Sequence, residues 1–133
     1  MVHEWALAEA IADYVEKHLR EAGGLAVRRI SVKLGQLQAI DREILRFSLN
    51  EILRDKGLSV AEIEFLDEAA AFQCRRCGHE WRLEEVGLDD NVREAIHFLP
   101  EAVHSFVKCP RCGSRDFSVV RGRGVYIERI EVV

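Results

Sequence analysis

Two Cys-X-X-Cys-Gly motifs constrain this chain more than any other feature. Cys74 and Cys77 form the first motif, and Cys109 and Cys112 form the second. Zinc prefers a tetrahedron of thiolates, so two such turns supply four ligands and leave no open position for a substrate. The N-terminus lacks the regions of a signal peptide, and reduced thiolates therefore fit better than disulfides. We expect a structural Zn²⁺ site.

The composition limits the class of protein further. The 133 residues are 48% hydrophobic, which is ample for one domain or two small ones. No apolar run approaches the roughly 20 residues of a membrane span, so we expect a cytoplasmic protein without membrane contact. The net charge is −4, and residues 74–115 contain as many Lys and Arg as Asp and Glu, seven of each. A surface without basic surplus does not drive phosphate binding, so no nucleic-acid partner is expected.

Two helices are expected in the first part of the chain. Residues 5–22 carry an apolar face at steps of three and four, and Gly23-Gly24 supplies the stop. The predicted face contains Trp5, Ala8, Ala12, Val15, Leu19 and Ala22. Asp41 is a suitable N-cap for the second helix, whose pattern ends near Gly57.

Three strands are expected to pair with one another. Apolar and polar residues alternate over residues 30–34 and again over 61–65. The tail, residues 125–132, is also strand-like, and its apolar phase changes near Glu128-Arg129, which indicates a bulge or a change of pairing. Because an isolated hairpin is marginal, the tail should return to the first sheet. The predicted fold class is α/β, with a small mixed three-stranded sheet and two helices.

The cysteine region is expected to interrupt this domain. We assign residues 1–70 and 118–133 to the α/β domain and 71–117 to a zinc-ribbon-like module. The module contains a helical insert, Leu88–Phe106, with Asp89 or Asp90 as its cap and a break at Pro100. The connections at 67–73 and 116–124 allow exchange of the module between two copies, so a homodimer is an alternative to a monomer.

Two histidine-containing stretches are ambiguous from the residues alone. His3-Glu4 precedes the first helix, where Glu4 complements the helix dipole, but an imidazole near a terminal amine is also a metal-binding pattern. His79 follows the first cysteine motif directly, and an exposed or sulfur-bonding imidazole is favoured there over a fifth ligand.

Several of these features together resemble the HypA/HybF family of nickel metallochaperones for hydrogenase maturation. The resemblance rests on His3-Glu4 before a helix, on residues 32–37 (VKLGQL), on the two cysteine motifs and on residues 121–126 (RGRGVY). It covers essentially the whole chain. The insert around residues 96–100 (IHFLP) resembles the archaeal branch in particular.

The resemblance implies a carrier that binds Ni²⁺, performs no chemical turnover and is not an enzyme. It implies nickel ligands at His3 and Glu4, with His97 of the insert completing the site, and zinc ligands at Cys74, Cys77, Cys109 and Cys112. The implied partners are a HypB-type GTPase and the large subunit of [NiFe]-hydrogenase. Glu4 contributes either its side chain or its backbone amide.

Val2 makes the number of nickel donors depend on Met1. If Met1 is retained, its amine, the amides of Val2 and His3 and the His3 imidazole fill all four planar positions, and His97 is redundant. If Met1 is removed, Val2 supplies the amine and one position stays open for His97. The alternative function is a zinc-ribbon adaptor that binds protein or nucleic acid.

Overall fold

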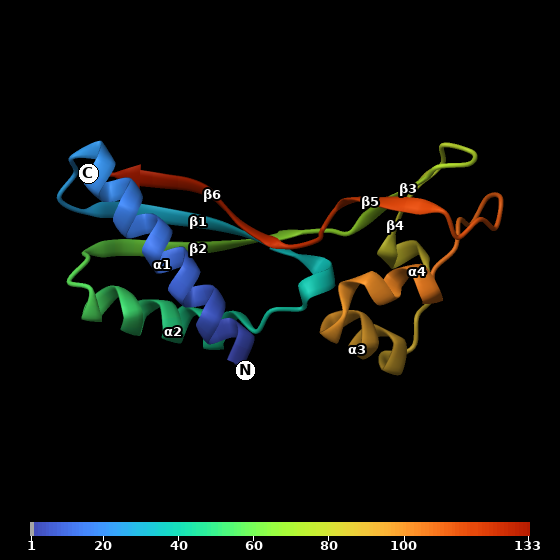
Figure 1. Cartoon of the computed structure of the whole chain (residues 1–133), viewed down its shortest axis with the longest axis horizontal. Helices are drawn as coiled ribbons and strands as arrows, with labels where there is room; N and C mark the ends of the chain where they lie inside the picture. Colours follow the sequence, from blue (N-terminus) through green and yellow to red (C-terminus); the bar gives the residue numbers. More distant parts are fainter. Residues whose placement is uncertain (1) are drawn as a thin grey trace. The chain divides into compact units, whose positions relative to one another are not determined.

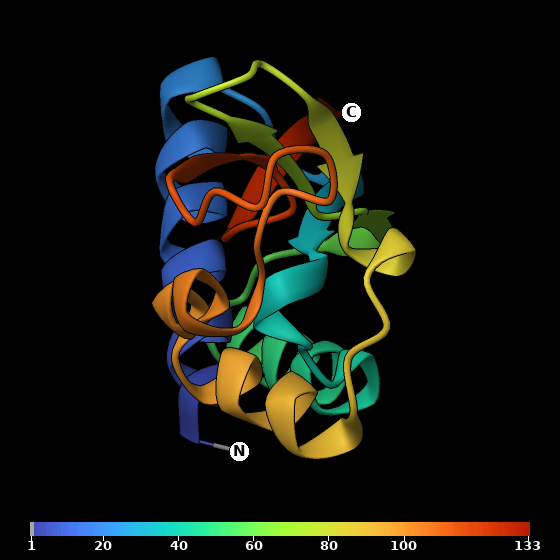
Figure 2. The same cartoon turned by 90° about the vertical axis from the view of Figure 1, so that its right-hand side faces the viewer.

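The computed structural model describes residues 2–133 and divides into two compact units (Figures 1 and 2). The first unit contains the described residues up to Lys33, together with Ile40–Leu66 and Tyr126–Val133. The second contains Leu34–Ala39 and Asp67–Val125. No helix among the described residues is long and apolar enough to cross a membrane.

The first unit is a mixed sheet of strand order β2-β1-β6 with two helices. Its elements are α1 (Val2–Ala22), β1 (Val27–Gly35), α2 (Arg42–Asp55), β2 (Val60–Glu68) and β6 (Val125–Val132). The amide of Val27 donates to Ser59, so β1 and β2 start side by side and run parallel. The amide of Val133 donates to Ala26, so β6 returns antiparallel to β1 (Figure 1). The predicted fold class is confirmed.

The helices of the first unit pack against each other and bury the apolar face of the sheet. Their buried residues are Ala8, Ile11, Ala12, Val15 and Leu19 in α1 and Leu45, Leu49, Ile52 and Leu53 in α2. Gly23 ends α1 with φ +67°, and the Asp41 carboxylate caps α2 by accepting from the amides of Glu43 and Ile44. The predicted end of α1 and the predicted start of α2 are confirmed.

The second unit is built around a second three-stranded sheet, of order β4-β3-β5, with a helical insert. Its elements are η1 (Gln36–Gln38), β3 (Ala71–Cys74), β4 (Glu80–Arg82), η2 (Leu83–Glu85), α3 (Asp90–Phe98), η3 (Pro100–Ala102), α4 (Val103–Phe106) and β5 (Phe117–Arg121). The Asp89 side chain caps α3, and the helix stops before Pro100, as predicted. Figure 2 shows the insert in gold and orange.

Three glycines of the second unit, Gly35, Gly122 and Gly124, bring backbone segments into direct contact; we call them the glycine junction. The amide of Gly35 donates to the Gly124 carbonyl, and the amide of Leu37 donates to the Gly122 carbonyl, both at 2.9 Å. A Cβ on Gly35 would lie 2.5 Å from the Gly124 oxygen. Only glycine fits there, and residues 34–39 belong to the second unit.

Candidate metal centres

The two cysteine motifs fold into matching knuckles. In each, the amide of the first cysteine donates at 2.8 Å to a carbonyl five residues on, that of His79 or of Ser114. The glycines that follow the motifs, Gly78 and Gly113, have φ of +78° and +77° and donate back to the carbonyls of Cys74 and Cys109. A positive φ favours glycine, which explains its place in both motifs.

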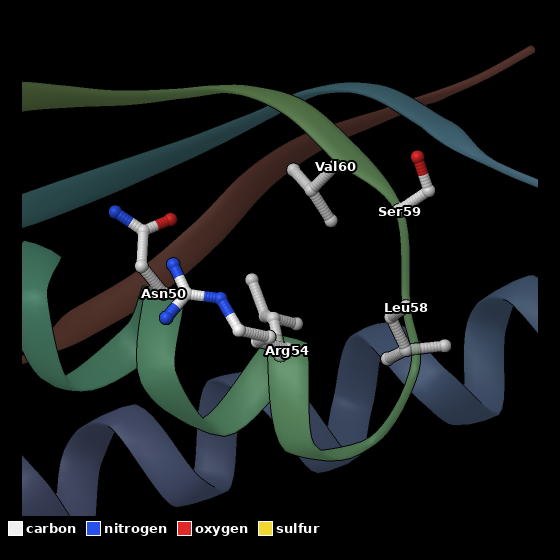
Figure 3. A pocket seen from close by; sticks show the side chains of 6 residues that line it. Asn50, Arg54, Leu58, Ser59 and Val60 are labelled. Atoms are coloured by element: carbon white, nitrogen blue, oxygen red, sulfur yellow. The ribbon is translucent and has the colours of Figure 1, made fainter.

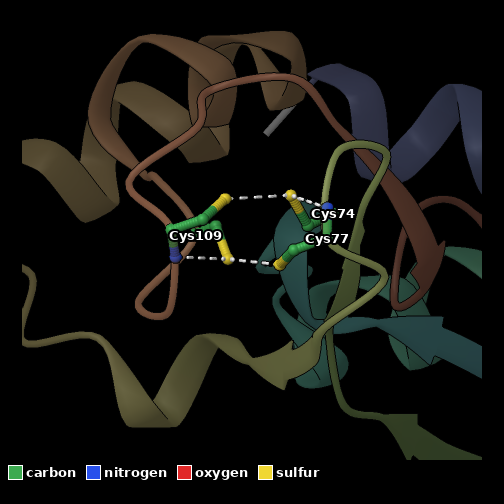
Figure 4. Close-up of side chains that lie close together, drawn as sticks. Cys74, Cys77 and Cys109 are labelled. Atoms are coloured by element: carbon green, nitrogen blue, oxygen red, sulfur yellow. Dashed lines mark hydrogen bonds between the residues drawn. The ribbon is translucent and has the colours of Figure 1, made fainter.

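The knuckles bring the four sulfurs together (Figure 4). Cys74 Sγ lies 3.6 Å from Cys112 Sγ, and Cys77 Sγ lies 3.7 Å from Cys109 Sγ. All four atoms lie within 4.8 Å of one another. A tetrahedron with Zn–S bonds of about 2.3 Å has sulfur–sulfur edges of about 3.8 Å, so the donor set fits zinc.

Hydrogen bonds within the knuckles shift the pKa values of the thiols. The Cys77 amide donates to Cys74 Sγ at 3.4 Å and is the main cause that lowers the pKa of Cys74 to about 6. Burial is the largest influence on Cys109 and opposes its thiolate, but the Cys112 and Arg111 amides together with the neighbouring thiols lower its pKa. The Ser114 amide favours the Cys112 thiolate, yet burial and the neighbouring sulfurs raise its pKa to about 11. Zinc binding should therefore release protons.

Aromatic packing supports the cysteine cluster from one side. Cys74 and Cys109 are buried in a core with Phe72, Trp81 and Phe117. The His79 ring stacks on Trp81 at 6.1 Å between centroids, and His104 stacks on Phe117 at 4.4 Å. Among the residues that the structure describes, the group with ligand atoms close enough to hold a metal contains only the four cysteines. These contacts agree with the interpretation of His79 as a residue that is not a zinc ligand.

The predicted nickel ligands at the N-terminus lie on the first turns of α1. The His3 ring is exposed, and its Nε2 lies 2.6 Å from Glu4 Oε1. Glu4 is buried, with 3% of its surface exposed, and its Oε2 accepts from the Asp41 amide at 3.2 Å. The carboxylate thus connects the imidazole with the N-terminus of α2. Met1, whose retention decides the donor count, lies outside the described residues.

The third predicted nickel ligand, His97, lies in α3 of the second unit. Its Nδ1 is 2.7 Å from the carbonyl oxygen of Gln38, the last residue of η1. Sequence patterns gave no indication of this contact because η1 follows the strand β1 directly and carries no periodic signal.

Two hollows lie elsewhere on the units. One, of about 260 Å³, is lined in the first unit by Asn50, Leu53, Arg54, Leu58, Ser59 and Val60 (Figure 3). The other, of about 220 Å³ in the second unit, is lined by Gln36, Leu37, Ala39, Leu83, Leu88, Arg93 and Ile96. Neither set contains a His, Cys, Asp or Glu, so neither hollow is a candidate metal site.

The family is decided by comparison with known proteins. The model of a family described as "Hydrogenase/urease nickel incorporation, metallochaperone, hypA" matches residues 2–132. The chain belongs to the HypA family. Curated HypA relatives include "Hydrogenase maturation factor HypA" of Pyrococcus horikoshii, 50% identical, and that of Thermococcus onnurineus, 48% identical. Each alignment covers 98% of this chain and 96% of the relative. These relatives agree with the archaeal type of HypA that the insert predicted.

Solved HypA structures share the fold. One, titled "Solution structure of HypA protein", is 17% identical with a TM-score of 0.66 and covers 100% of this chain and 98% of its own. Another, "Solution structure of the Ni metallochaperone HypA from Helicobacter pylori", is 14% identical with a TM-score of 0.62. It covers 98% of this chain and 97% of its own. At these identities the likeness shows the HypA fold alone.

Proposed function

We propose that this protein is a nickel carrier that binds Ni²⁺ through its N-terminus and delivers it to the large subunit of [NiFe]-hydrogenase together with a HypB-type GTPase. The observation that carries the proposal is the family match over residues 2–132. The protein performs no chemical turnover in this role. Four reduced cysteines are typical of proteins in a reducing compartment, which supports a cytoplasmic location for this role.

The chemistry of the N-terminus supports nickel. A terminal amine, backbone amides and an imidazole form the planar nitrogen set that Ni²⁺ accepts. Glu4 Oε1 lies 2.6 Å from His3 Nε2, an ion-pair contact that favours a proton on that nitrogen and leaves the lone pair of the neutral ring on Nδ1. Nδ1 is the ring nitrogen nearer the His3 amide, and the two close a small chelate ring. We therefore assign the Glu4 backbone or its orienting carboxylate, rather than a coordinating side-chain oxygen, to the site.

The cysteine module supports a structural role beside this cargo site. Four thiolates saturate zinc, so the zinc itself would have no open coordination position. Of its basic residues, Arg75 pairs with Asp116 at 2.8 Å and Arg115 donates to the Ser105 carbonyl at 2.9 Å. Because both arginines already have partners within the module, these contacts favour the carrier function over a nucleic-acid adaptor.

The test is a nickel titration of the zinc-loaded protein by calorimetry, after intact mass has shown whether Met1 is present. His3→Ala should weaken nickel binding by at least about 100-fold. With Met1 removed, His97→Ala should also weaken it, by at least about 10-fold. His18→Ala is the matched control, because His18 lies in the body of α1 and stacks on Tyr14. Unchanged nickel affinity in both His3→Ala and His97→Ala would contradict the proposed site.

Delivery is tested separately. Nickel-loaded protein is mixed with the nickel-free large subunit of hydrogenase, with and without a HypB-type GTPase and GTP. The two proteins are then separated, and the nickel bound to the large subunit is quantified. We expect transfer to depend on the native N-terminus. Equal transfer by His3→Ala protein would contradict delivery from that terminus.

A further inference from the structure

The main chain of Gln38 contacts His97 in the second unit. The Gln38 carbonyl oxygen lies 2.7 Å from His97 Nδ1. A carbonyl only accepts, so Nδ1 carries the proton, and in the neutral ring the lone pair is on Nε2. Histidines that bind metals commonly donate their other ring nitrogen to a carbonyl or carboxylate, which fixes the tautomer and the ring orientation.

Gln38 is itself held in place from three directions. Its side-chain Oε1 accepts from the Gly124 amide at 2.6 Å. The preceding residue, Leu37, is fully buried in the core of the second unit, and its amide donates to Gly122. The following residue, Ala39, has φ +45°, a left-handed conformation that a residue other than glycine rarely adopts. These constraints aim the Gln38 carbonyl at α3.

We infer that Gln38 is a positioning residue for nickel: its carbonyl holds His97 with Nε2 as the donor, and its side chain fixes that carbonyl through Gly124. The inference rests on the proposed function, because it concerns the same nickel site. It adds that the His97 donor is prepared before nickel arrives. It also makes Gly124, in the glycine junction, part of the support of a metal ligand.

The experiment separates positioning from a merely structural contact. Gln38→Met removes the side-chain acceptor at similar length, whereas Gln38→Glu keeps an acceptor oxygen. Gln73→Met is the control, because Gln73 is exposed in β3 of the same unit. Nickel affinity is measured by calorimetry on zinc-loaded protein without Met1, in the native and His97→Ala backgrounds. Long-range ¹H–¹⁵N NMR reads the His97 tautomer in the metal-free protein.

We expect Gln38→Met to weaken nickel binding about 10-fold in the native background and not at all in His97→Ala. Gln38→Glu should stay within about threefold of the native affinity, and Gln73→Met should match it. The native protein should show His97 protonated at Nδ1, and Gln38→Met should show a mixture of tautomers.

Four results would overturn the inference. Equal losses in both backgrounds would mean that Gln38 acts on general stability alone. A native His97 protonated at Nε2 would contradict the assigned donor. Lowered affinity in His97→Ala with native affinity in Gln38→Met would contradict the inference and leave the proposed function intact, whereas native affinity in His97→Ala would contradict the His97 ligand itself.

Discussion

The two predicted nickel histidines are held through opposite ring nitrogens. His3 is engaged at Nε2 by the Glu4 carboxylate, and His97 is engaged at Nδ1 by the Gln38 carbonyl. His3 must use Nδ1 because that atom lies near its own amide, whereas His97 comes from another part of the chain and can approach a metal with Nε2. Each supporting contact leaves the lone pair on the nitrogen that geometry requires.

Replacing Glu4 tests its role at the N-terminus. Glu4→Ala removes a buried carboxylate that contacts His3 and the Asp41 amide, so the free energy of unfolding should fall by about 1–3 kcal/mol. Nickel affinity should fall about 10-fold, because His3 loses its orienting partner but keeps its donor. Thermal unfolding and calorimetry measure the two effects.

The visible absorption of the nickel-loaded protein identifies the coordinating atoms. If the Glu4 side chain only orients His3, the d–d band keeps its position in Glu4→Ala. A shifted band would show that the carboxylate coordinates nickel. Glu9→Ala, an exposed position on the same helix, should change neither stability nor spectrum.

At the scale of elements, local rules predicted most of the first unit. The Asp41 cap, the glycine stops and the alternation that places Ile63 and Phe65 inward all follow from spacing. Spacing failed where burial depends on distant neighbours. Trp5 begins the predicted apolar face of α1 yet is 43% exposed, and Ile11, which lay outside that pattern, is buried.

The segment after β1 could not be predicted for the same reason. Gln36 and Gln38 are polar and carry no helical or strand period, but their side chains accept from the amides of Ala70 and Gly124. Such contacts join residues far apart in the sequence, so no local pattern indicates them. The clustering of the four cysteines was predictable because their spacing is itself the signal.

A single methyl group tests the packing of the glycine junction. Gly35 has an ordinary φ of −66°, so Gly35→Ala introduces no backbone strain, only a Cβ 2.5 Å from the Gly124 oxygen and 2.6 Å from the Gly122 oxygen. The free energy of unfolding should fall by about 1–3 kcal/mol, as measured in denaturant. Gly87→Ala meets nothing within 4 Å and should leave stability unchanged. Equal stability of the two variants would contradict the tight packing.

At the scale of the molecule, the two units depend on metal differently. The first unit has an apolar core of its own, whereas the core of the second unit incorporates Cys74 and Cys109. A small unit with thiolates in its core needs the metal for folding. The domain boundaries predicted from sequence stay a prediction. The contacts assign residues 34–39 to the second unit, which contains the four cysteines.

Zinc removal should therefore unfold one unit selectively. After chelation, hydrogen exchange should become fast in β3, β4 and β5, while amides of α1 and α2 stay protected. The same chelator saturated with zinc is the control, and readdition of zinc should restore protection. Uniform loss of protection across the chain would show that the first unit does not stay folded when the second unfolds.

The position of the two tryptophans gives the protein its own optical readout. Trp81 lies in the zinc unit, 1% exposed, and within the described residues its indole nitrogen makes no hydrogen bond. Trp5 lies in α1, close in sequence to His3 and partly exposed. Because Trp81→Phe gives up no hydrogen bond, it isolates the emission of Trp5. A red shift from a solvated Trp81 indole should then report loss of the expected zinc, and quenching of Trp5 should follow the proposed nickel. One unlabelled chain would thus distinguish the two metals by wavelength and intensity.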